Sequence, residues 1–258
     1  MIVLGTRDRE EASRVYWELP NGLHYWRGNY IESPPDAQFA PQSFLVRQLP
    51  GRTNPSHYHA RNQFQLFTDG SGSIGRHEIR PYVVHYAGAY TGYGPIASGP
   101  DGINYLTLRA QWDPGAQWLP EKMASLVRGP KLHYSSETLT LLDSSSLLAL
   151  AAPTMHWVHR DDQHGLGVSQ YRLPPHRSLD VPHLARSIGM YLVVLAGAVQ
   201  HDGVLLERLE NIFVSSTEPS YALTTGALPA EVLALEFPDT DPAYASAHLA
   251  LPGRDTGA

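Results

Sequence analysis

The chain of 258 residues contains no cysteine. This absence excludes disulfides, thiolate nucleophiles and thiolate metal ligands together. Any metal would therefore have to be held by histidine, carboxylate, amide or phenolate groups.

Charged side chains are also scarce. They make up 17% of the chain, against roughly 25% in average soluble domains. Lysine and arginine number 19, they form no basic run, and the net charge is −6. A surface that neutralises nucleic-acid phosphates needs clustered cations. We therefore expect no nucleic-acid partner.

Long apolar runs are missing as well. No stretch approaches the roughly 20 apolar residues of a membrane span, and the start of the chain lacks the basic segment and apolar run of a signal peptide. We expect a cytoplasmic protein without a membrane partner.

Turn-forming residues, in contrast, are abundant. The 22 glycines and 21 prolines separate short runs rich in β-branched and aromatic residues, which is typical of an antiparallel barrel or sandwich. Only residues 121–127 have a helical composition, and Gly129-Pro130 would end that helix.

The second half of the chain repeats the order of the first. Matching the Leu-Pro turns of the two halves places His59 on His183, and matching their turn glycines places Gln63 on Met190. A period near about 125 residues is too long for a solenoid and indicates a duplicated domain.

We expect five segments: an N-terminal arm or strands over residues 1–40, an N-terminal barrel over 41–120, a connector over 121–145, a C-terminal barrel over 146–240 and a tail over 241–258.

The most informative segment runs from Gly51 to Gly70. Five residues separate Gly51 from His57-Tyr58-His59, three more precede Gln63, and six precede Gly70. Side chains alternate along a strand, so positions 57, 59 and 63 can face the same side. Two imidazoles and an amide oxygen with open coordination positions suit Fe, Mn, Ni, Cu or Zn.

This spacing resembles the first motif of the cupin superfamily, Gly-x5-His-x-His-x3,4-Glu-x6-Gly, with Gln63 where the family usually has Glu. The resemblance implies an all-β fold of two tandem jelly-roll barrels with few short helices. It also implies that His57, His59 and Gln63 bind a divalent transition metal in the N-terminal barrel. We favour Fe(II), with Mn, Ni, Cu or Zn as alternatives. Because an amide is neutral, Gln63 would bind the cation more weakly than a glutamate.

The family's second motif, Gly-x5-Pro-x-Gly-x2-His-x3-Asn, is degraded. Its best match begins at Ala89 and places Pro100 where the third histidine would stand. His85 or Tyr93 could replace that histidine as a ligand or hold the substrate, and we assign both to the catalytic site.

Two further residues are candidates for substrate binding. An inward-facing Arg109 would anchor a substrate carboxylate, because arginine is always charged and can bind in a bidentate manner. Tyr90 belongs to a tyrosine cluster that could line a pocket mouth. In the second half, Met190 and a lone His183 make a poor metal site, so we expect the C-terminal barrel to be structural.

The leading functional hypothesis is a metal-dependent enzyme that acts on a small organic substrate. A dioxygenase is favoured by analogy with other proteins of two cupin barrels and one intact site. The alternatives are a metal-dependent lyase or isomerase and a non-catalytic protein that binds a small molecule. The low charge is compatible with a homodimer, although a duplication would already supply an internal dimer.

Overall fold

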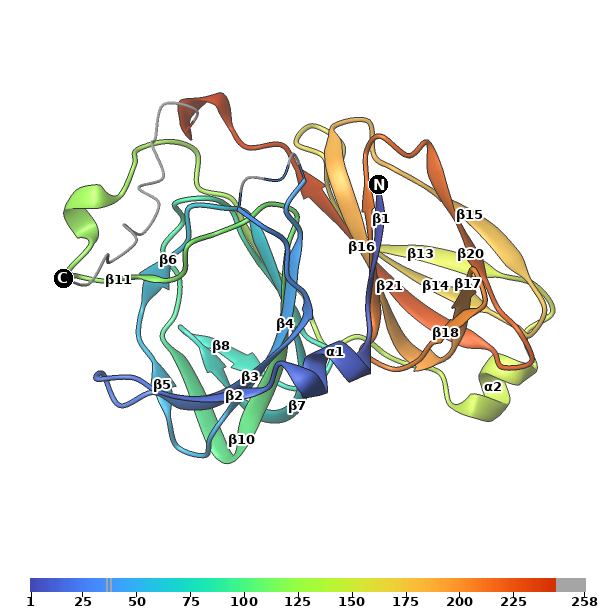
Figure 1. The fold of residues 1–258 in the computed structure, drawn as a ribbon, viewed down its shortest axis with the longest axis horizontal. Helices are drawn as coiled ribbons and strands as arrows, with labels where there is room; N and C mark the ends of the chain where they lie inside the picture. Colours follow the sequence, from blue (N-terminus) through green and yellow to red (C-terminus); the bar gives the residue numbers. More distant parts are fainter. Residues whose placement is uncertain (36, 38, 245–258) are drawn as a thin grey trace.

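The computed structural model describes residues 1–35, 37 and 39–244. Within these ranges nearly all of the regular secondary structure is β-strand, arranged as two barrels that lie side by side (Figure 1). The all-β fold with two barrels, predicted from the sequence, is confirmed. Residues 245–258 of the expected tail lie outside the described residues.

The N-terminal barrel is built on a nine-stranded sheet. Its main path runs in the order β12 (His133–Ser135), β9 (Val84–Ala87), β7 (Gln63–Ile74), β10 (Ile96–Arg109), β4 (Gln42–Gln48), β3 (His24–Ile31) and β2 (Val15–Glu18). Off this path, β5 (Thr53–Asn54) pairs with β10 and β8 (His77–Ile79) pairs with β7. A separate antiparallel pair is formed by β6 (His57–Tyr58) and β11 (Gln117–Trp118).

The C-terminal barrel contains a six-stranded and a four-stranded sheet. The larger has the order β1 (Ile2–Gly5), β19 (Asn211–Ser215), β16 (Ser187–Gly197), β21 (Ala230–Pro238), β14 (Leu166–Leu173) and β13 (Thr154–Asp161). The smaller has the order β15 (Ser178–Pro182), β20 (Ser220–Thr224), β17 (Val199–His201) and β18 (Val204–Leu206).

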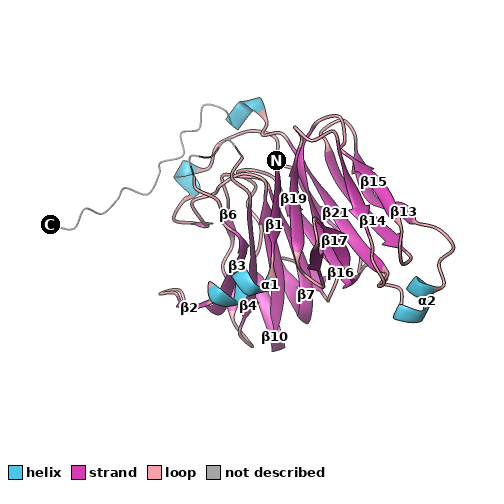
Figure 2. Ribbon diagram, turned by 45° about the vertical axis from the view of Figure 1, so that its right-hand side comes forward, coloured by secondary structure: helices cyan, strands magenta, loops and turns pink. Residues whose placement is uncertain are grey.

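The two large sheets share one topology. The path β9-β7-β10-β4 of the first corresponds to the path β19-β16-β21-β14 of the second. Each path is extended by the strand that precedes the other barrel in the chain. β12 pairs with β9, and the N-terminal β1 pairs with β19, beside which it lies in Figure 2. These two pairings tie the barrels together, one through the N-terminal segment and one through the segment between the barrels.

Alternation along β7 and β16 explains where the core lies. Phe64 and Leu66 of β7 pack with Tyr191 and Val193 of β16 in one apolar cluster shared by the two barrels. Burying such side chains stabilises the fold by about 1.5–3 kcal/mol each. The residues between them therefore face the opposite way, so Gln63 and Gln65 point into the N-terminal barrel.

Helices are few and short in the described residues. They are α1 (Arg7–Ala12), α2 (Ser144–Leu148) and the 3-10 turns η1 (Met123–Ser125) and η2 (Pro242–Tyr244). The α-helix expected over residues 121–127 is wrong, because only η1 forms there. So short a segment, bounded by Pro120 and Gly129-Pro130, cannot offset the cost of helix nucleation.

Among the described residues, no helix is long and apolar enough to cross a bilayer.

Candidate functional site

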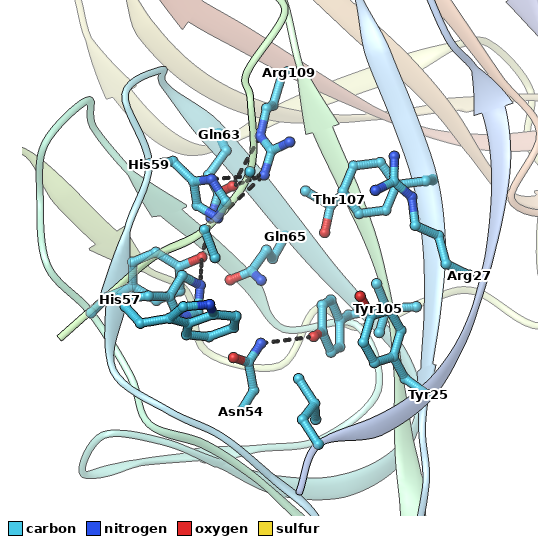
Figure 3. Close-up of a pocket in the computed structure, with 17 residues that line it drawn as sticks. Tyr25, Arg27, Asn54, His57, His59, Gln63, Gln65, Tyr105, Thr107 and Arg109 are labelled. Carbon is cyan, nitrogen blue, oxygen red and sulfur yellow. Dashed lines mark hydrogen bonds between the residues drawn. The ribbon is translucent and has the colours of Figure 1, made fainter. Parts of the chain in front are cut away.

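A cavity of about 160 Å³ lies inside the N-terminal barrel. Its walls come from β3, β4, β7 and β10, and from the segments around β5, β6 and β11 (Figure 3). Of the residues singled out in the sequence, His57, His59, Gln63, Tyr93 and Arg109 all line it.

His57 is fixed on two sides. Its Nδ1 lies 2.6 Å from the carbonyl oxygen of Pro55, which can only accept, so Nδ1 carries the proton. Nε2 therefore accepts from the hydroxyl of Tyr93 at 2.7 Å. Paired backbone hydrogen bonds between His57 and Tyr93 hold the two residues opposite each other. Burial, and then the neighbouring His59, lowers the pKa of His57 to about 3, so the imidazole is neutral.

His59 has a similar arrangement with a different partner. Its Nδ1 lies 2.7 Å from Oδ1 of Asp113, so it donates there and leaves Nε2 as an acceptor. The backbone N–H groups of Ala60 and Gly115 also donate to Asp113, at 3.0 and 2.8 Å. Burial alone would raise the pKa of Asp113, but the neighbouring His59 and Arg109 and these hydrogen bonds lower it overall.

Arg109 supplies a buried cation at the centre of the site, and its side chain is 4% exposed. Nη2 donates to Oε1 of Gln63 at 2.9 Å, and it lies 3.2 Å from Nδ1 and 3.3 Å from Nε2 of His59. Because a guanidinium can only donate, the Gln63 carbonyl must face Arg109, and its NH₂ donates to the Tyr93 hydroxyl. Oδ1 of Asp113 lies 3.8 Å from Nη1 of Arg109.

The site resembles a metal centre in one respect. Each histidine turns Nε2 inwards while Nδ1 is held by an outer acceptor, as in ligating histidines. However, Nε2 of His57 is already occupied by the Tyr93 hydroxyl, Arg109 lies against the ring of His59, and the Gln63 carbonyl accepts from Arg109. The described residues contain no group of three His, Cys, Asp or Glu side chains that could hold a metal. As arranged, these side chains do not fit a divalent metal ion, and the cation between them is the guanidinium of Arg109.

A second guanidinium faces the same cavity. Arg27 of β3 lies over the ring of Phe44, at 3.8 Å from its centroid, and Arg109 lies 5.4 Å from the same centroid. Arg27 Nε donates to Asn29, and no described carboxylate lies within 4.0 Å of its nitrogens. Burial, and then the charge of Arg109, lowers the pKa of Arg27. Two arginines thus face the cavity, with Asp113 beside Arg109 and with Glu32 acting on Arg27 from beyond 4.0 Å.

The structure does not bring His85 and Tyr90 to the cavity wall. His85 donates to or accepts from Ser135 Oγ at 2.8 Å, and its ring centroid lies 5.4 Å from that of Tyr93. Tyr90 packs on Tyr58 in a separate aromatic cluster.

Several lining residues were not recognised in the sequence. Gln65 could have been found, because it has the same parity as Gln63 on the same strand. Asn54 lies inside the Gly51–His57 spacing and carried no signal of its own. Arg27 and Asp113 reach the site through long-range folding: β3 pairs with β4, and Asp113 folds back from the end of β10 onto His59.

No family model matches the chain, and the comparison with curated proteins gave no match. Solved structures do match. The bacterial pirin YhhW from Escherichia coli, in complex with nickel(II), is 11% identical, with a TM-score of 0.53 over 93% of this chain and 100% of its own. Oxalate decarboxylase OxdC of Bacillus subtilis is 11% identical, with a TM-score of 0.56 over 93% of this chain and 78% of its own.

A candidate dioxygenase from Nostoc punctiforme is 13% identical, with a TM-score of 0.53 over 97% of this chain and 82% of its own. All three neighbours are cupin-fold proteins. Similarity at this level of identity concerns the fold, and it confirms that the chain has the cupin jelly-roll fold that the histidine motif predicts.

Proposed function

We propose that the N-terminal barrel binds a small organic anion of the carboxylate class through Arg27 and Arg109. The observation that carries this proposal is the unbalanced positive charge of the cavity. Of the two guanidiniums, Arg109 shares Asp113 with His59, and Arg27 has no carboxylate within 4.0 Å among the described residues. Arg27 is half-buried, and a charge that is partly removed from water without a carboxylate partner is unfavourable, so a ligand carboxylate would stabilise the site.

The two arginines contribute differently. Arg109 is engaged by Gln63 and His59, so it acts mainly through its charge. The terminal nitrogens of Arg27 have no hydrogen-bond partner among the described residues, and they can bind a carboxylate with two parallel hydrogen bonds.

The volume and the lining of the cavity limit the size and the polarity of the ligand that it can hold. A protein cavity of about 150 Å³ is known to accept benzene, and this one measures about 160 Å³. Leu23, Phe44 and Trp118 supply apolar wall. A monocarboxylic acid of about the size of benzoate is therefore the expected ligand.

Titration calorimetry with benzoate tests the proposal. Binding in the wild type should weaken at least about tenfold in Arg27→Gln, the loss expected for a charge-assisted hydrogen bond. Arg80→Gln is the matched control, because Arg80 is exposed and pairs only with Glu78. Unchanged affinity in both Arg27→Gln and Arg109→Gln would overturn the proposal.

The second candidate is the metal-dependent oxygenase predicted from the sequence. The neighbours support a metal-dependent protein, since the pirin is in complex with nickel(II) and the oxalate decarboxylase has Mn(II) centres. The decarboxylase fits the alternative of a lyase, and the candidate dioxygenase fits an oxygenase. In this chain it requires the Arg109 guanidinium to leave Gln63 and His59.

Metal analysis of untagged protein separates the two candidates. One equivalent of Fe, Mn, Ni, Cu or Zn that is lost in His57→Ala would favour the oxygenase. If the protein takes up no metal after Fe(II) or Mn(II) is added, binding of an organic anion without metal remains as the proposed function of this barrel.

A further inference from the structure

Two buried side-chain oxygens at the cavity have no hydrogen-bond partner among the described residues. They are Oε1 of Gln65 and Oδ1 of Asn54. Both side chains are more than nine-tenths buried, with exposures of 2% and 8%. A buried amide that lacks a partner is unfavourable, and native proteins rarely leave one so. These atoms therefore mark places where a bound molecule would supply a hydrogen bond.

Asn54 lies away from Arg109, and Gln65 lies between them. On β10 the side chains of Tyr105, Thr107 and Arg109 point to the same side, so Tyr105 and Arg109 are about 13 Å apart along the strand. Nδ2 of Asn54 lies 3.5 Å from the Tyr105 hydroxyl. Figure 3 shows Arg109 and Asn54 at opposite ends of the cavity, with Gln65 between them. The cavity thus has a cationic end and an amide end.

We infer that the ligand is a small hydroxy-carboxylic acid whose hydroxyl lies on the far side of the molecule from its carboxylate. This inference rests on the proposed function, which supplies the carboxylate at Arg27 and Arg109. A hydroxyl suits the amide end because it both donates and accepts, so it satisfies an amide in either orientation. A carboxylate would suit the amide end less well, because it only accepts and no cation lies beside Asn54.

Three related aromatic acids, two of which are isomers, test the inference in the unmodified protein. Benzoate carries no hydroxyl, 2-hydroxybenzoate carries it beside the carboxylate, and 4-hydroxybenzoate carries it at the opposite end of the ring. Calorimetry should give 4-hydroxybenzoate an affinity at least about tenfold higher than either of the others. Equal affinity of benzoate and 4-hydroxybenzoate would overturn the hydroxyl assignment while leaving the anion site intact. A preference for the 2-isomer would overturn the assigned geometry.

Variants assign the hydroxyl to its partner. Asn54→Leu should remove most of the preference for 4-hydroxybenzoate over benzoate. Asn104→Leu is the matched control, because Asn104 lies on β10 but not on the cavity wall, and it should keep the preference. Arg27→Gln should weaken all three acids together.

The two proposals fail in different ways. If none of the acids binds, or if neither Arg27→Gln nor Arg109→Gln weakens any of them, the proposed function is overturned and the inference falls with it. If the acids bind but Asn54→Leu keeps the full preference in a folded protein, the assignment to the amide end is overturned.

Discussion

The two barrels share one topology, but their interiors differ: the N-terminal barrel contains a cavity, and the C-terminal barrel is filled with apolar side chains. At matching places on β7 and β16, Gln65 of the N-terminal barrel corresponds to Leu192 of the C-terminal barrel. In the C-terminal barrel Leu192 belongs to a cluster of buried apolar side chains that fills the interior. In the N-terminal barrel the same inward positions line a cavity. Whether a barrel of this fold encloses an apolar core or a cavity therefore depends on a few inward-facing strand positions, which are polar in one barrel and apolar in the other.

The charges at the centre of the barrels are also reversed. In the C-terminal barrel, Glu236 of β21 lies opposite Met190 of β16. The corresponding pair in the N-terminal barrel is Arg109 of β10 and Gln63 of β7. Glu236 Oε2 lies 3.4 Å from Nδ1 of His183, whose side chain is 9% exposed. A carboxylate at this place would repel an anion, so the proposed acid site belongs to the N-terminal barrel alone.

The largest effect is expected when a cavity residue is placed in the filled barrel. Leu192→Gln should lower the free energy of unfolding by about 4 kcal/mol, because apolar burial is lost and an amide is left without partners. The reverse change, Gln65→Leu, should be neutral or stabilise by up to about 1 kcal/mol. Urea unfolding measures both. Equal losses in the two variants would contradict the contrast between the interiors.

Removing the buried carboxylate of the N-terminal barrel should have the next largest effect. Asp113→Asn leaves Arg109 without its counter-charge and should cost about 3 kcal/mol of stability. Asp162→Asn, which breaks an exposed ion pair with Arg160 in the C-terminal barrel, should cost less than about 1 kcal/mol. Similar losses on urea unfolding would speak against a buried charge cluster.

Site residues that are close together in the sequence could be predicted from it, whereas partners that are distant in the sequence could not. His57, His59 and Gln63 lie on one short segment, so their spacing and parity place them together before any fold is known. The repeat places Met190 on Gln63 in the same way, and the strand registers agree. The partners that decide the chemistry are distant: 54 residues separate His59 from Asp113 in the chain. For that reason the sequence indicates a metal site, whereas the assembled contacts place Arg109 among the expected ligands.

Acid should destabilise the N-terminal barrel through its buried histidines. Burial lowers the pKa of both His57 and His85 to about 3, so between pH 6.5 and 3 the unfolded chain binds protons that the folded chain excludes. Stability should therefore fall as the pH falls, by about 2 kcal/mol per histidine from pH 7 to pH 5. His57→Gln should remove its share of this loss in urea unfolding at the two pH values. An unchanged loss would mean that His57 titrates alike in both states.

The smallest expected effect is a difference in stability between two variants, each of which removes a tyrosine hydroxyl that is hydrogen-bonded to a histidine. Tyr93→Phe removes the hydroxyl that serves His57 and Gln63 inside the N-terminal barrel, and should cost about 1 kcal/mol. Tyr221→Phe removes a similar bond to His201 in the C-terminal barrel, but His201 is half-exposed and can bind water instead, so the loss should be smaller. Thermal unfolding of the two variants side by side would reveal the difference, and a larger loss in Tyr221→Phe would contradict it.

The most direct test of the central claim is a calorimetric titration of chelator-treated protein with benzoate. The account predicts one bound acid per chain, because only the N-terminal barrel carries the paired arginines, and it predicts the same affinity before and after the chelator. No binding, two acids per chain, or binding that returns only when a divalent metal is added would contradict it.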